Sequence, residues 1–140
     1  MKSFGTAAGA AEVAALARGL HAYLAAVEAR EYAKACSLTI TARQAPQRGK
    51  PCPTVLAETF KSGFYKGADA SFPSLVVVGA RTSEEAGGKG YALVARSASA
   101  KPEEFVAMRR EGGVWKPAVF APFPLDPKIA LARYKATFSE

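Results

Sequence analysis

The chain has few of the residues from which metal centres and hydrolytic sites are built. Its 140 residues include a single histidine, His21, and only two cysteines, Cys36 and Cys52. One histidine excludes any site that needs two, and without a second cysteine pair a structural zinc site lacks ligands. The Gly-x-Ser-x-Gly motif is absent, and Gly87-Gly88-Lys89-Gly90 lacks the spacing of a phosphate-binding loop. The sequence therefore predicts no metal, no cofactor and no nucleophilic serine centre.

Long apolar runs are also lacking. The longest stretches, such as residues 75–80, are far too short to span a bilayer, so no transmembrane helix is expected. The opening Met1-Lys2-Ser3 is not followed by the apolar core and cleavage site of a secretory signal. A secreted form would therefore have lost its signal segment ahead of this sequence, which is an assumption of any extracytoplasmic assignment.

Acidic residues are outnumbered, with 12 Asp and Glu against 19 Lys and Arg, which gives a formal net charge of +7. Such a balance permits attraction to anionic surfaces, although a solvated basic surface that gives solubility is the simpler interpretation. Arg109 and Arg110 near Trp115 resemble a nucleic-acid stacking site only superficially, because neighbours on a strand point to opposite faces. We therefore do not expect nucleic acid as a partner.

Helical periodicity dominates the first half of the chain. Apolar residues recur at steps of three and four between residues 11 and 30, on the stripe formed by Val13, Leu16, Leu20, Leu24 and Val27. A shorter helical pattern covers residues 31–38, and the proline- and glycine-containing residues 44–53 predict a loop. Pro53 suits the first turn of a third helix, whose pattern is ended by Gly63 and Gly67.

After Gly67 the period changes to alternation, which predicts strands at residues 74–81, 89–99, 103–111 and 114–120. Gly112-Gly113 predicts a tight hairpin between the last two, and Pro117 predicts an edge position or a bulge. A further helical pattern follows Asp126. Helices followed by consecutive antiparallel strands predict an α+β fold, with N-terminal helices packed on a curved sheet and an extra C-terminal helix.

Several segments resemble small secreted bacterial members of the nuclear-transport-factor-2-like superfamily, whose cone-shaped fold is shared with ketosteroid isomerases and SnoaL-like cyclases. The resemblance covers residues 11–120 and is carried by four segments: Ala22-Tyr23-Leu24-Ala25-Ala26, Tyr32-Ala33-Lys34-Ala35-Cys36-Ser37-Leu38, Cys52-Pro53 and Arg110-Glu111-Gly112-Gly113-Val114-Trp115-Lys116. It implies a cone-shaped domain at residues 11–120. The remaining residues are expected to form a flexible segment at 1–10 and a C-terminal extension at 121–140, whose helical pattern is not a standard part of that fold. The fold hosts enzymes, adaptors and binding modules alike, so it does not by itself define an activity.

The two cysteines flank the same loop, which favours a disulfide between Cys36 and Cys52 over free thiols or half of a metal site. Such a bond would contribute roughly 3 kcal/mol and would persist in an oxidising compartment. We therefore expect an extracytoplasmic location, with a cytoplasmic one as the alternative.

The isomerases of the superfamily that this chain resembles use a carboxylate as base, and a tyrosine or a protonated acid that stabilises the oxyanion. This chain departs from that pattern, since its strand acids lie mainly at strand ends, where they are solvated. Asp69 is the one acid near a plausible cavity mouth, but a loop-capping role is favoured. His21 lies at the edge of the first helical stripe. A histidine at such a position is more often hydrogen-bonded or partly exposed to solvent than catalytic. We therefore predict no catalytic residue.

The sequence thus predicts a non-catalytic binding module for a small apolar ligand or a protein partner. The ligand would contact aromatic residues between the helices and the sheet: Tyr23, Phe60, Phe64 and Tyr91. A solid core without a pocket is the competing interpretation. Two other functions stay open, namely an isomerase, cyclase or hydratase, and an envelope interaction domain that forms a homodimer through the sheet.

Overall fold

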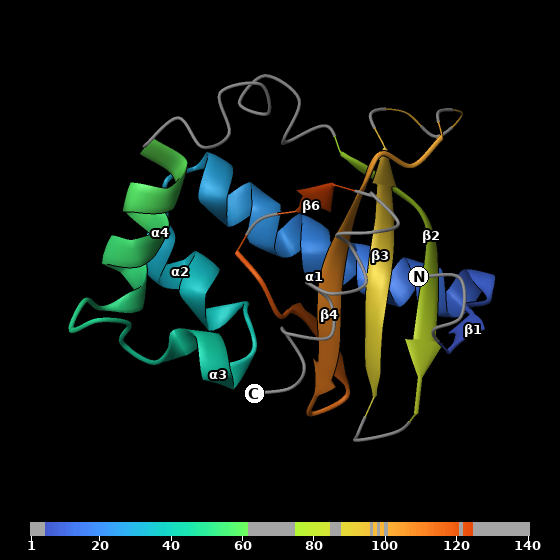
Figure 1. Cartoon of the computed structure of the whole chain (residues 1–140), viewed down its shortest axis with the longest axis horizontal. Coiled ribbons are helices and arrows are strands. Elements are labelled where there is room, and N and C mark those ends of the chain that lie inside the picture. Colours follow the sequence, from blue (N-terminus) through green and yellow to red (C-terminus); the bar gives the residue numbers. More distant parts are fainter. Residues whose placement is uncertain are drawn as a thin grey trace.

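The protein has an α+β fold in which N-terminal helices pack against an antiparallel sheet, as expected from the sequence (Figure 1). The computed structural model describes residues 5–61, 75–84, 88–95, 97, 99, 101–120 and 122–124. Several sequence predictions lie outside these residues: the helix after Asp126, the positions of Phe64 and Asp69, and the glycines expected to end the third helix, Gly63 and Gly67.

The first half of the described chain forms four helices: α1 (Ala10–Glu28), α2 (Tyr32–Ser37), α3 (Thr41–Gln44) and α4 (Cys52–Lys61). The long helix α1 ends where Arg30 adopts a left-handed conformation with φ 58°. There the Glu31 N–H donates to the Ala26 carbonyl and the Arg30 N–H to that of Val27, which satisfies the last turn and redirects the chain into α2. The sequence pattern did not predict α3, which lies between the expected helix at residues 31–38 and the expected loop at residues 44–53 and overlaps that loop only at Gln44.

The strands are β1 (Thr6–Ala7), β2 (Val76–Ser83), β3 (Lys89–Ala95), β4 (Glu104–Glu111), β5 (Val114–Pro117) and β6 (Phe123–Pro124). They pair antiparallel in the order β1-β2-β3-β4-β5, and β6 pairs with β4 beyond the end of β5. The register shifts between Val77 and Gly79, where a bulge interrupts the pairing of β2 with β3. The two-residue strand β1 was not predicted, because so short a segment carries no alternation.

The β4–β5 hairpin follows the prediction from Gly112-Gly113, since both glycines have positive φ, 59° and 80°. The expected strand to residue 120 instead ends at Pro117. Ala118 still donates its N–H to the Ala107 carbonyl at 2.8 Å, after which the chain bends before β6. Among the described strands β5 pairs only with β4, so Pro117 lies at the edge that the sequence predicted.

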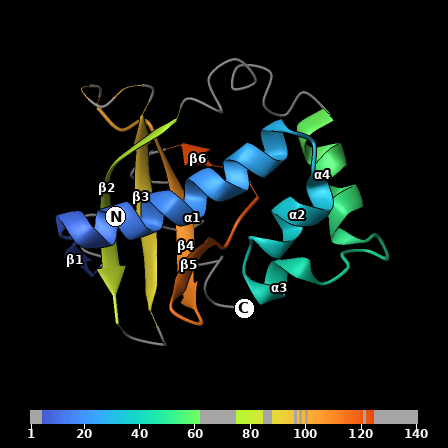
Figure 2. The ribbon, with the colours of Figure 1, turned by 180° about the vertical axis from the view of Figure 1, so that it is seen from behind.

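Helix α1 lies across one face of the sheet, as Figure 2 shows from behind. The residues predicted to face the core are buried, with exposures of 0% for Leu16, 1% for Leu20, 3% for Leu24 and 6% for Val27. On the sheet side α1 meets Met108 and Trp115, which share a face of β4 and β5. The predicted helix stripe is therefore confirmed as the core face. No helix within the described ranges is long and apolar enough to cross a membrane.

Candidate functional site

A surface groove of about 250 Å³ opens between the exposed side of α1, the end of α2 and the β4–β5 hairpin. Its lining is mainly apolar, with two cationic side chains among otherwise uncharged residues: Ala15, Arg18, Gly19, Ala22, Leu38, Gly113, Val114, Trp115 and Lys116. Val114 is 54% exposed and is the one large hydrophobic side chain in the described part of the chain that is exposed. An apolar groove with few polar groups at its rim is the usual form of a ligand site.

Small residues on α1 create the room for this groove. Ala15, Gly19 and Ala22 follow one another at steps of four and three, so they share a helix face beside the buried leucine stripe. Gly19 also permits the close approach of α1 to β5, because a Cβ atom built there would lie 2.0 Å from the Trp115 carbonyl oxygen. Larger residues at these positions would fill the groove or push α1 away from the sheet.

The hairpin side of the groove is held in place by a cluster around Trp115, which is 3% exposed. The Arg110 guanidinium lies over the Trp115 ring, with its carbon 5.4 Å from the ring centroid. Arg110 also forms ion pairs with Glu84 and, at 3.7 Å, with Glu12 of α1. The hydrogen bond to Glu84 raises the pKa of Arg110. Through these contacts Arg110 of β4 connects Glu12 of α1 with the ring of Trp115 in β5. They stabilise the hairpin on which Val114 lies.

The end of α2 supplies Leu38, and hydrogen bonds tie this segment to the end of β5. The Ile40 N–H donates to the Pro117 carbonyl at 3.0 Å, and Arg43 Nε donates to the Ala118 carbonyl at 2.8 Å. The Thr41 N–H donates to Glu111 Oε1 at 3.0 Å, across the start of α3. These bonds join residues at least 70 positions apart in sequence, and they hold Leu38 beside the hairpin.

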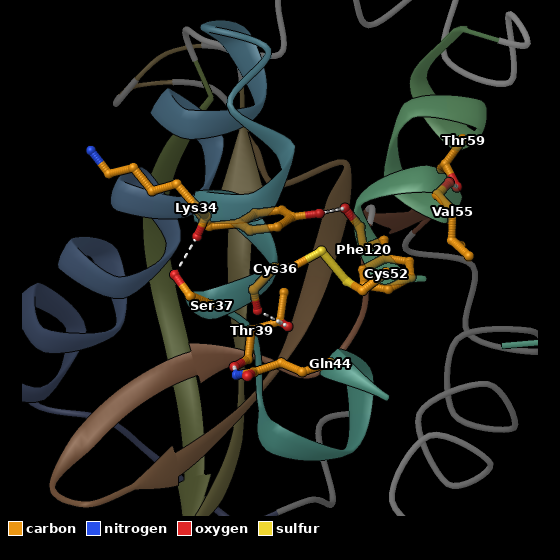
Figure 3. Close-up of a disulfide and its surroundings, with 10 residues drawn as sticks. Lys34, Cys36, Ser37, Thr39, Gln44, Cys52, Val55, Thr59 and Phe120 are labelled. Atoms are coloured by element: carbon orange, nitrogen blue, oxygen red, sulfur yellow. Dashed lines mark hydrogen bonds between the residues drawn. A yellow bond between two sulfur atoms is a disulfide. The ribbon is translucent and has the colours of Figure 1, made fainter. Parts of the chain in front are cut away.

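A disulfide between Cys36 of α2 and Cys52 of α4 confirms the predicted pairing (Figure 3). The two Cα atoms are 6.2 Å apart, and both cysteines are buried. Next to the bond, Thr39 Oγ1 donates to the Cys36 carbonyl at 2.7 Å, and Gln44 Nε2 donates to the Thr39 carbonyl at 2.9 Å. The covalent link therefore lies two residues before Leu38 and braces the segment that forms that side of the groove.

The aromatic residues predicted to bind a ligand do not share one described cavity. Tyr23 is buried on α1 and its hydroxyl donates to the Phe120 carbonyl at 2.6 Å, whereas Phe60 is half-buried on α4. Tyr91 packs edge-to-face on Phe105 with ring centroids 6.0 Å apart. Since Gly90 faces Trp115, the next residue, Tyr91, lies on the sheet face that α1 does not cover. Burial raises the pKa of the Tyr91 phenol, and the charge of Arg81 partly offsets this. None of these residues lines the groove, and their ligand-binding role remains a prediction.

The candidate acid–base residue His21 lies apart from the groove. It is exposed on α1, and its Nε2 lies 3.2 Å from the Leu75 carbonyl oxygen, at the entrance to β2. Within the ranges that the structure describes, no three His, Cys, Asp or Glu side chains lie close enough to hold a metal ion. The groove itself has no acidic lining residue, so its described side chains supply no carboxylate base.

Comparison of the chain with models of known protein families, with curated protein sequences and with solved structures gave no match.

Sequence reasoning missed the groove, although two of its components carry visible patterns. The spacing of Ala15, Gly19 and Ala22 marks a small-residue face on α1, and Val114 follows a two-glycine turn, where a polar residue would be ordinary. The position of Leu38 has no such signature, because it depends on hydrogen bonds between α2–α3 and the end of β5.

Proposed function

We propose that the protein is a non-catalytic binding module that holds a small apolar ligand in the groove between α1 and the β4–β5 hairpin. The observation that carries this proposal is the exposed Val114 beside a recess formed by small residues of α1. A large aliphatic side chain that is exposed to water next to an apolar recess is unfavourable in free energy. A ligand that covers both surfaces removes this unfavourable contribution.

The size of the groove sets the size of the ligand. At about 250 Å³ it is below the roughly 300–1,000 Å³ of sites for drug-sized molecules. A single ring or a short branched chain therefore suits it better than a steroid or a polyketide. This favours binding of a small molecule over the isomerase or cyclase chemistry of larger substrates.

We also propose that the chain is a small extracytoplasmic relative of the nuclear-transport-factor-2-like proteins. The order of helices before an antiparallel sheet, with α1 across one face, supports this relationship. The disulfide supports an oxidising compartment, because such bonds are rare in the reducing cytosol. A homodimer through the sheet is less favoured, since Tyr91 and Phe105 on one face and Met108 on the other are already buried.

Filling the groove tests the proposal. Ala22→Phe should lower the affinity for a neutral apolar probe, cyclohexanol, by about tenfold or more, because the ring would occupy the recess. The affinity is measured by titration with NMR detection of backbone amide shifts. Ala14→Phe is the matched control, since Ala14 is an exposed alanine of the same helix that does not line the groove.

The control should bind cyclohexanol as the wild type does. If wild-type protein binds no cyclohexanol, or binds it equally well after Ala22→Phe, the groove is not the site. Concentration-dependent dimerisation that Ala22→Phe abolishes, with no binding of the probe, would instead establish the interaction-domain function.

A further inference from the structure

We infer that the groove selects small apolar anions, with a carboxylate as the preferred head group, held by Arg18 and supported by Lys116. This inference rests on the proposed function, because it names the ligand class of the same site. It follows from the distribution of charge around the groove.

Arg18 is an exposed cation at the rim of an apolar recess. The helix positions three and four residues away, which are its neighbours on the surface of α1, are Ala14, Ala15, His21 and Ala22. None of these is acidic. In the described part of the chain Arg18 also forms no ion pair or side-chain hydrogen bond. Its guanidinium is therefore free to bind an anion from solution.

The acidic residues near the groove have partners other than Arg18. Glu12 pairs with Arg110 at 3.7 Å, and that guanidinium lies over the Trp115 ring. Glu111 accepts hydrogen bonds from both the N–H and the hydroxyl of Thr41. No lining residue of the groove is acidic, so nothing described in it competes with a ligand for Arg18.

Lys116 is the second cation of the lining, and it is half-buried. Its ammonium group lies 4.0 Å from Glu111 Oε1, the outer limit of an ion pair. Because Glu111 also accepts hydrogen bonds from Thr41 and lies at the outer limit of an ion pair, it offsets the field of the Lys116 ammonium only in part. Arg18 is the principal partner, since a guanidinium can donate two parallel hydrogen bonds to a carboxylate.

An isosteric pair of probes tests the preference for an anion. Cyclohexanecarboxylate and cyclohexanecarboxamide present the same ring, and only the first is charged. Because the cations are near the surface, we expect the carboxylate to bind about three- to tenfold more tightly at low ionic strength. Raising the salt concentration should reduce this ratio.

Two variants assign the preference to a residue. Arg18→Gln should bring the affinities for the two probes close to equality, because it weakens binding of the carboxylate more than binding of the amide. Lys101→Gln is the control, because it removes the same charge from an exposed position outside the groove. It should preserve the carboxylate preference, which excludes an effect of net charge alone.

Equal binding of the two probes by wild-type protein would overturn the inference and leave the proposed function intact. Binding of neither probe would contradict both. A carboxylate preference that survives Arg18→Gln at full size would also overturn the inference, since the anion would then be recognised elsewhere.

Discussion

Gly19→Ala is expected to lower the free energy of unfolding by about 2–3 kcal/mol, although alanine is the better helix former. The added Cβ atom would lie 2.0 Å from the Trp115 carbonyl oxygen and 3.6 Å from Met108 Cε. The oxygen belongs to the backbone of β5, so it cannot move aside as a flexible side chain could. Helix α1 would have to shift away from the sheet, with loss of packing along its leucine stripe. Denaturant unfolding measures the change.

Gly79→Ala is the matched control for this substitution. It also adds one methyl group to a half-buried glycine, but the nearest atom to the new Cβ would be Leu93 Cδ1 at 3.6 Å, an ordinary contact. We expect a change within about 0.5 kcal/mol. Equal stability of the Gly19→Ala protein and the wild type would show that α1 and β5 are not in the close contact described.

Removal of the disulfide by the double substitution Cys36→Ala and Cys52→Ala should cost about 3 kcal/mol, as a loop closed over 16 positions predicts. Alanine avoids burying two hydroxyl groups in place of the sulfurs. Among the described elements α4 packs chiefly on α2, so loss of the bond should loosen α4 before the sheet. Thermal unfolding and amide hydrogen exchange measure the two effects.

Reductant provides the control for the double variant. Reduction should destabilise the wild-type protein by a similar amount and leave the variant unchanged. Two thiols that react with an alkylating agent in the folded, non-reduced wild-type protein would contradict the bond, and with it the main support for an oxidising compartment.

Local patterns predicted those parts of the fold that local physics determines. The spacing of Leu16, Leu20 and Leu24 predicted both a helix and its buried face, and both are confirmed. The Gly112-Gly113 pair predicted a hairpin because only a turn with two positive φ angles suits that sequence so well. The two cysteines predicted their own bond, since each is the only partner for the other.

Features that depend on contacts between distant segments were not predictable in the same way. Helix α3 is held at its start by Glu111, seventy residues later in the chain, and its four residues are too few for a helical period to be recognised in the sequence. The alternation in β3 places Tyr91 and Ala92 on opposite faces of the sheet. It does not indicate which of the two faces α1 covers, because both residues are apolar and buried. The groove likewise exists only where α1, Leu38 and the hairpin meet.

Locating a bound ligand tests most directly whether the groove is the binding site. Intermolecular nuclear Overhauser effects between cyclohexanecarboxylate and methyl-labelled protein report which side chains the ring touches. We predict contacts with the methyl groups of Ala15, Ala22, Leu38 and Val114, which line the groove. If the ring instead contacts the side chains of Tyr23, Phe60 or Tyr91, the ligand binds at the predicted aromatic residues. That result would contradict the proposal that the groove is the binding site.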